Sequence, residues 1–231
     1  ALHSQYKRKI SEIGAEFVAV KTNPIDEIWV DQPAPPLAPI TTHSMRFAGK
    51  SSQEKRMSVL DRLIGAKQDA ALITSLDSIA WLLNIRGGDV PFTPLALSFL
   101  LICADGKVYW FVDKRKLLPH VTKNFDSDII IQDIEQIGLI LKEIVSKLTN
   151  IAVDKSRVPI FLVSVLENAG TKVINGPDPC LLPKACKNDI EVEGIRAAHI
   201  RDGVAMTFFL AWLDKMAPKG LVTEISAAEY L

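Results

Sequence analysis

The sequence lacks an excess of charge of either sign. Its 231 residues include 27 Lys and Arg and 27 Asp and Glu, so the formal net charge at pH 7 is zero. Partners such as nucleic acid or an anionic membrane surface require clustered positive charge, so we expect no binding to either. The longest apolar stretch, residues 94–104, is far shorter than the ~20 residues that cross a bilayer. The first residues also lack the apolar segment of a secretory signal.

Cysteine and histidine are scarce. Three cysteines are too few and too scattered for a disulfide framework or a zinc knuckle, and we therefore expect a reducing, cytoplasmic setting. The four histidines lie too far apart for an H-E-x-x-H metal site. The G-x-S-x-G, Walker A and G-x-G-x-x-G motifs are absent as well. The residues concerned, none of which is expected to bind a metal, are Cys103, Cys180, Cys186, His3, His43, His120 and His199.

What the sequence does contain is an alternation of helix and strand signals. Hydrophobic residues make up 48% of the chain and charged residues 23%, which excludes a disordered protein. Residues 105–107 predict a hairpin turn between the apolar runs 95–103 and 108–112. Together the signals predict an α/β fold with a mixed sheet flanked by helices. Other strands are expected over 17–21, 70–74, 128–132, 151–154 and 172–175, and helices over 6–13, 51–64, 75–83, 114–118, 134–148, 159–168 and 189–216.

The same signals divide the chain into three parts. Four prolines between residues 33 and 39 forbid a regular helix and predict an extended connector, so we place the first part at 1–49. The compact α/β unit covers 50–182, and the long helix opens a third part, 183–231. That helix carries a broad apolar face and needs a large partner to bury it. The chain starts inside a helical pattern and stops about one turn into another, so we expect it to be a piece of a longer protein.

One loop is chemically conspicuous. Residues 86–89, Arg-Gly-Gly-Asp, lie between a hydrophobic helix and a hydrophobic strand. The glycines allow close backbone approach, and the Arg86 guanidinium can hold a carboxylate or a carbonyl. Two interpretations stay open: an Arg86–Asp89 pair that braces the loop, or contact with a ligand or a neighbouring catalytic domain.

Three stretches in order resemble a known family. Residues 77–91, which read DSIAWLLNIRGGDVP, are similar to the middle-domain signature of the cytosolic three-domain Xaa-Pro aminopeptidases (aminopeptidase P) of the creatinase/prolidase pita-bread family. Residues 23–33 resemble the linker that leaves the first domain of that family. Residues 187–205 resemble the entry helix of its catalytic domain.

The resemblance implies a metallopeptidase that releases an N-terminal residue preceding proline. In that family two divalent ions, commonly manganese, supply the nucleophile and polarise the amide. Their ligands, two Asp, a His and two Glu, follow the entry helix, so the resemblance places no catalytic or metal-binding residue in this chain. The chain alone should be inactive and hold no metal.

The resemblance also implies a layout and partners. Residues 1–49 would end the first domain, 50–182 would be a complete middle domain that shapes substrate access, and 183–231 would open the pita-bread catalytic domain. Arg86 and Asp89 would line the mouth of the cleft as substrate-binding residues. The expected partners are peptides with proline at the second position and a second copy bound through the catalytic domain.

Two alternatives to this reading remain. One is another pita-bread hydrolase, such as a prolidase or creatinase, although those typically carry a single N-terminal domain. The other is a pseudo-peptidase that has lost the downstream metal ligands and binds a peptide partner.

Overall fold

The computed structural model describes residues 2–18, 20 and 22–231. It separates into two compact units. The first consists of Ala1–His43 with Lys50–Cys186, and the second of Ser44–Gly49 with Lys187–Leu231.

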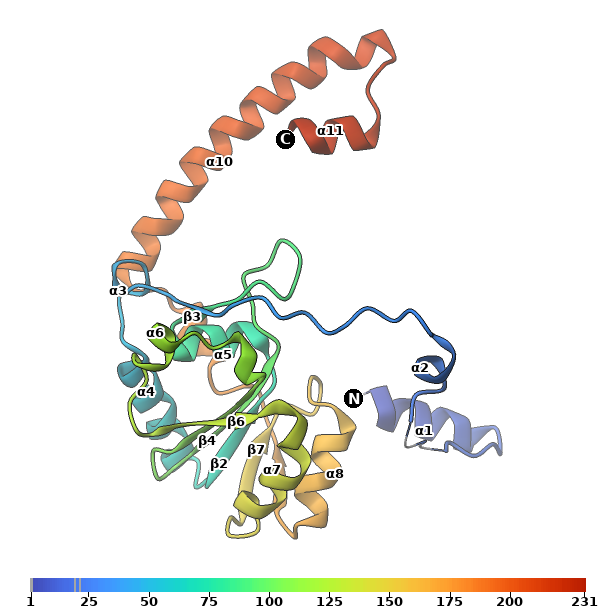
Figure 1. The fold of residues 1–231 in the computed structure, drawn as a ribbon, viewed down its shortest axis with the longest axis vertical. Coiled ribbons are helices and arrows are strands. Elements are labelled where there is room, and N and C mark those ends of the chain that lie inside the picture. The colour runs from blue at the N-terminus through green and yellow to red at the C-terminus, as the bar shows by residue number, and fades with distance from the viewer. Residues whose placement is uncertain (1, 19, 21) are drawn as a thin grey trace. The chain divides into compact units, whose positions relative to one another are not determined.

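A six-stranded mixed sheet forms the centre of the first unit (Figure 1). The order of its strands is β6-β5-β4-β2-β7-β8. Antiparallel pairing joins β4 to both β2 and β5, whereas β6, β7 and β8 pair in parallel with their neighbours. The predicted mixed sheet is therefore confirmed. The strands are β2 (Ala70–Ile73), β4 (Ser98–Cys103), β5 (Val108–Val112), β6 (Ile129–Asp133), β7 (Asn150–Val153) and β8 (Lys172–Asn175).

Helices cover both faces of this sheet. Helices α4 (Ser52–Gly65) and α5 (Leu76–Leu83) bury their apolar residues in one cluster, and α7 (Ile137–Val145) and α8 (Ile160–Asn168) bury theirs in the other. Adjacent strand residues alternate between the clusters, as the two-residue period of a strand requires. Trp110, for example, belongs to the first cluster and Phe111 to the second, and both are fully buried.

Helix starts illustrate which local signals hold. Either Ser51 or Ser52 could cap α4 by its sequence, and the structure has Ser51, which forms a capping box with Glu54. Ser75 has the residue type and position of a cap for α5, but its hydroxyl makes no cap hydrogen bond. Instead Ser75 Oγ accepts a hydrogen bond of 3.2 Å from Arg157 Nη1. A partner from a distant part of the chain has replaced the local one.

Several short elements differ from the sequence prediction. Residues 17, 18 and 20 do not form the strand expected over 17–21, and residues 19 and 21 lie outside the described part of the chain. The helix expected over 114–118 is a single 3₁₀ turn, η1 (Lys114–Lys116). Elements that the sequence does not indicate are β1 (Thr41–Thr42), α3 (Met45–Ala48), β3 (Ile85–Arg86), α6 (Pro119–Thr122) and α9 (Leu181–Ala185). The helix expected over 134–148 begins as a 3₁₀ turn, η2 (Ile134–Gln136). Helix α1 (Leu2–Glu12) overlaps the helix expected over 6–13, and α2 (Pro24–Ile28) follows a turn at Asn23 where the sequence indicates a short helical stretch.

The second unit is built on a long helix, α10 (Asp189–Met216), whose predicted bounds are confirmed. Asn188 caps it: Oδ1 accepts from the Glu191 N–H, and Nδ2 donates to the carbonyl of Ala48 at the end of α3. After the 3₁₀ turn η3 (Ala217–Lys219), helix α11 (Glu224–Tyr230) returns so that Tyr230 stacks on Trp212, with ring centroids 4.2 Å apart.

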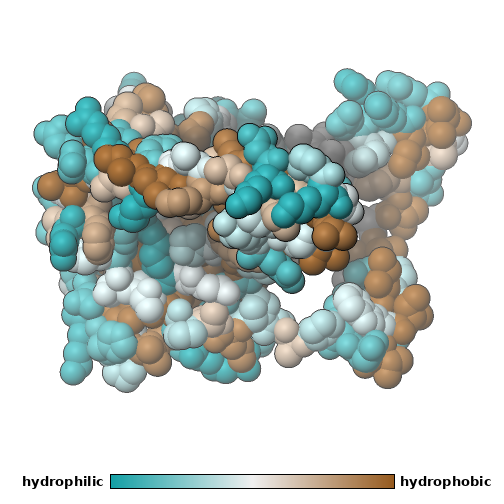
Figure 2. Space-filling view, turned by 90° about the horizontal axis from the view of Figure 1, so that it is seen from above, coloured by the Kyte–Doolittle hydropathy of each residue, from teal (hydrophilic) through white to brown (hydrophobic). Residues whose placement is uncertain are grey.

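Apolar side chains are exposed on both units. No residue of α10, all of which are described, is buried in this chain. Figure 2 shows apolar residues, in brown, among hydrophilic ones on the face that it presents. In the part of the chain that the structure describes, no helix is both long and apolar enough to span a bilayer.

The three free cysteines differ in exposure. Cys103 on β4 and Cys180 before α9 are buried, whereas Cys186 is exposed. Burial disfavours the charged thiolate, raising the pKa of Cys103 to about 12 and that of Cys180 well above its usual value. Cys103 is thus part of the hydrophobic core.

We expect one of the three thiols to react rapidly in the native protein. Cys186 is accessible, while Cys103 and Cys180 remain protonated and covered at pH 8. Titration with an aromatic disulfide reagent before and after adding denaturant measures both classes. In Cys186→Ser the rapid phase should vanish, and two or more rapid thiols in the unmodified chain would contradict this account.

Candidate functional site

The candidate site is the loop between β3 and β4, residues 87–97, which folds back on itself. The Gly87 N–H donates to the Pro94 carbonyl (3.1 Å), and the Asp89 N–H donates to the Leu95 carbonyl (3.0 Å). A side chain at Gly87 would not fit, because its Cβ would lie 2.7 Å from the Ala96 nitrogen. The glycine is therefore required by the close approach of the two arms of the loop.

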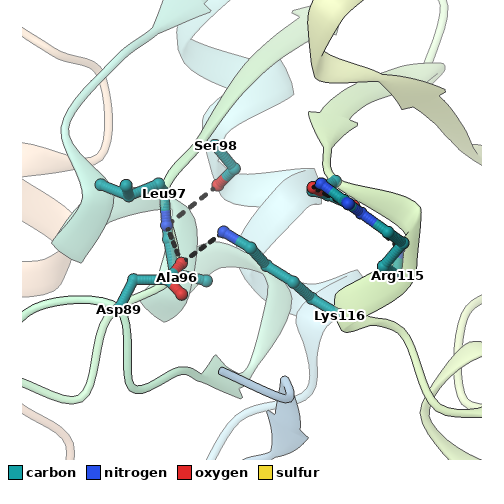
Figure 3. Close-up of polar contacts among 7 residues, drawn as sticks. Asp89, Ala96, Leu97, Ser98, Arg115 and Lys116 are labelled. Carbon is teal, nitrogen blue, oxygen red and sulfur yellow. Dashed lines mark hydrogen bonds and ion pairs between the residues drawn. The ribbon is translucent and has the colours of Figure 1, made fainter. Parts of the chain in front are cut away.

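Asp89 holds this loop from inside the protein (Figure 3). Its carboxylate is fully buried, and Oδ2 accepts hydrogen bonds of 2.7 Å from both Lys116 Nζ and the Leu97 N–H. The Lys116 side chain is 4% exposed. Oδ1 is buried too and has no hydrogen-bond partner among the described residues. A buried charge pair of this kind is costly to break, because either charge alone would be left without compensation.

The turn η1 sets the position of Lys116. Asp113 caps the turn by accepting a hydrogen bond from the Arg115 N–H, and its carboxylate also accepts hydrogen bonds from the Arg115 guanidinium. These hydrogen bonds lower the pKa of Asp113 to about 2, so the cap stays charged in all but strongly acidic solution. The Lys116 carbonyl in turn accepts from the Ile40 N–H, which ties the end of the proline-rich connector to the same turn.

Arg86 lies half-buried at the base of the loop. It sits on β3, which pairs with β1 so that Arg86 is opposite Thr41. Its Nη1 donates to the Ile85 carbonyl at 2.7 Å. Whether Arg86 or Asp89 contacts a substrate stays a prediction, but the buried Asp89 carboxylate is already engaged within the protein.

Asn84 fixes the start of β3. It has a left-handed backbone (φ 52°), and its Oδ1 accepts from Lys55 Nζ at 2.6 Å. Its Nδ2 donates to the Lys50 carbonyl, and its own carbonyl accepts from the His43 N–H. Lys55 also lies over the Trp81 ring, 4.9 Å from its centroid. A buried lysine thus holds the helix end from which the loop departs.

Sequence reasoning identified the loop but not its support. Lys116 is 27 positions from Asp89, and in the sequence it is one of three consecutive basic residues at the start of the helix expected over 114–118. The one available signal was the Asp113 before them, a residue type that favours turns and helix starts.

A metal site would need several His, Cys, Asp or Glu side chains close together. Among the described residues, no three His, Cys, Asp or Glu side chains form a group that could hold a metal ion. His3 falls outside this comparison, because its side chain is not described. The described side chains therefore do not fit the two divalent ions that the resemblance implies.

Residues 31–191 match the model of the creatinase/prolidase N-terminal domain, so the chain belongs to that family. This confirms the resemblance and the fold class inferred from the sequence.

Individual relatives are more specific. A protein described as a probable Xaa-Pro aminopeptidase P from Aspergillus flavus is 34% identical over 227 residues, which is 94% of this chain and 35% of the relative. The crystal structure of X-prolyl aminopeptidase from Caenorhabditis elegans, described as a cytosolic enzyme with a di-nuclear active site, matches with a TM-score of 0.86 at 28% identity. That match covers 99% of this chain and 38% of the enzyme. The chain thus spans little more than a third of these relatives.

A more distant structure shares the fold alone. The Xaa-Pro dipeptidase from Bacillus anthracis matches 78% of this chain and 47% of its own, with a TM-score of 0.57 at 17% identity.

Breaking the buried ion pair should destabilise the protein strongly. Lys116→Met leaves the Asp89 carboxylate buried without a counter-charge, and we expect a loss of about 3–5 kcal/mol in the free energy of unfolding. Urea denaturation measures it. The double variant Asp89→Leu/Lys116→Met should recover most of the loss, since it removes both charges.

Lys107→Met is the matched control for this experiment. Lys107 pairs with Asp105 in an exposed hairpin turn, and its loss should cost no more than about 1 kcal/mol. Equal effects of Lys116→Met and Lys107→Met would show that the buried pair does not hold the loop.

Proposed function

We propose that this chain is the N-terminal part of an Xaa-Pro aminopeptidase, a metal-dependent hydrolase that releases an N-terminal residue preceding proline. The observation that carries the proposal is the match of 99% of the chain to the C. elegans X-prolyl aminopeptidase with a TM-score of 0.86. The similarity to the A. flavus relative over 94% of the chain supports it independently.

In this proposal the chain shapes substrate access to the active site and supplies no catalytic residue. Two divalent ions, manganese in our proposal, would be held by residues elsewhere in the longer protein, since the described residues do not fit them. The first unit would narrow access to the cleft, with Arg86 at its mouth. Asp89 would act through the loop that it holds, because its carboxylate is occupied by Lys116.

The setting and assembly are part of the same proposal. We place the enzyme in the cytoplasm, supported by free thiols at all three cysteines and by the description of the C. elegans relative as cytosolic. We also propose a homodimer formed through the catalytic domain. The apolar residues of α10 that are exposed in this chain are consistent with burial in such a larger assembly.

The longer protein that carries this chain should cleave Xaa-Pro peptides, whereas the 231-residue chain alone should not. Hydrolysis of a tripeptide with proline at the second position, followed by chromatography, checks both. Metal analysis of the isolated chain should find no stoichiometric manganese or zinc. A longer protein that binds the peptide without cleaving it would favour the pseudo-peptidase, and strict preference for Xaa-Pro dipeptides would favour a prolidase.

In the longer protein, Arg86→Ala should raise KM for an Xaa-Pro tripeptide about tenfold, because the substrate would lose one charge-assisted hydrogen bond. Arg86→Lys should recover little, because an ammonium lacks the planar fork of the guanidinium. Arg62→Ala, on the exposed face of α4, is the control and should leave KM unchanged. A lower melting temperature with unaltered kinetics would assign Arg86 to bracing the loop.

A further inference from the structure

The tip of the 87–97 loop presents a fully exposed aromatic ring. Phe92 is 109% exposed, more than in an extended reference chain, and its neighbours Pro91, Thr93 and Pro94 are exposed too. Its backbone is left-handed, with φ 59°. Bulky side chains rarely adopt this conformation, since the Cβ then crowds the backbone carbonyl.

The exposure of the Phe92 ring and its left-handed backbone both fail to stabilise the fold of this chain. A strained backbone costs free energy, and an exposed ring contributes no burial. Strain of this kind persists where the surrounding structure determines it, and it gathers at functional sites.

Hydrogen bonds of the surrounding loop hold Phe92 in its left-handed conformation. The Thr93 N–H donates to the Val90 carbonyl (3.1 Å) and closes the turn that carries Phe92. Below the turn, the backbone hydrogen bonds of Gly87 and Asp89 and the buried carboxylate of Asp89 hold both arms. The two prolines restrict the tip further, because the ring of each fixes its φ angle. The ring is therefore presented in a preformed conformation, which lowers the entropy lost on binding.

The size and chemistry of the tip indicate what it binds. One aromatic side chain buries about 150–250 Å², whereas stable protein–protein interfaces bury about 1,200–2,000 Å². A tip of four residues therefore suits a short peptide better than a second folded protein. The residues of the tip carry no charge, which favours an apolar ligand group, and the rigid pyrrolidine of proline is one that aromatic side chains recognise.

We propose that Phe92 is a specificity-determining residue whose ring packs against the prolyl part of a peptide substrate. This inference rests on the proposed peptidase function. It adds a contact with the peptide substrate that is made by this N-terminal part of the longer protein.

Phe92→Gly in the longer protein tests it, because glycine removes the ring and relieves the left-handed strain together. We expect KM for an Xaa-Pro tripeptide to rise about tenfold with kcat within about twofold, and the melting temperature not to fall. Phe92→Tyr, which keeps the ring, should keep the normal KM. Binding of a tripeptide with a reduced, uncleavable Xaa-Pro bond, measured by calorimetry, should weaken by the same factor.

Lys67→Gly is the matched control, since Lys67 is exposed and also left-handed (φ 54°) but lies outside the loop. It should leave KM unchanged. If the unmodified protein cleaves the tripeptide and Phe92→Gly leaves KM and binding unaltered, the inference is wrong and the proposed function stands. A fall in melting temperature without a change in KM would show that the ring packs on the rest of the protein and would also overturn the inference. No cleavage by the unmodified protein would overturn both.

Discussion

The buried pair of Asp89 and Lys116 is the interaction on which the loop and its surroundings depend. It joins the loop after β3 to the turn after β5, and through the Lys116 carbonyl it holds the connector at Ile40. Desolvation of two charges opposes such a pair, and Asp89 Oδ1 has no hydrogen-bond partner among the described residues. We infer that its main effect is on conformation, because this arrangement of the segments pairs the two charges and other arrangements would leave them unpaired.

The sheet and the long helices could be predicted because their signals are local. Alternation along β4 and β5 sends Trp110 and Phe111 to opposite faces, and the sequence shows this as two near-continuous apolar runs. Ser51 and Asn188 cap α4 and α10, and the glutamate that completes each capping box lies only three positions further along the sequence. Such signals need no knowledge of the rest of the chain.

The support of the candidate site could not be predicted, because it consists of contacts between distant residues. No residue near Asp89 in the sequence indicates its ion pair with Lys116. Likewise, no residue near Ser75 indicates that Arg157 donates a hydrogen bond to the Ser75 hydroxyl. The two-residue pairing of β1 with β3 likewise depends on how the connector returns to the sheet, and isolated segments of that length carry no strand signal. Residues 17, 18 and 20, the described part of the strand expected over 17–21, form no strand for the reverse reason: the composition suits a strand, but pairing is decided by tertiary structure.

The distribution of charge explains what this part of the protein can do. Lys116 neutralises the acidic residue of the loop, and Lys55 is directed at Asn84 and the Trp81 ring, so these buried charges serve structure. Arg86 at the base of the loop is half-buried, and Phe92 at the tip is uncharged and exposed; contact of either with an outside ligand remains our proposal. A guanidinium and an aromatic ring can orient a peptide, but neither can activate water at neutral pH. For the proposed peptidase we infer that this domain would act by positioning the peptide, with the rigidity of its loop given by Asp89.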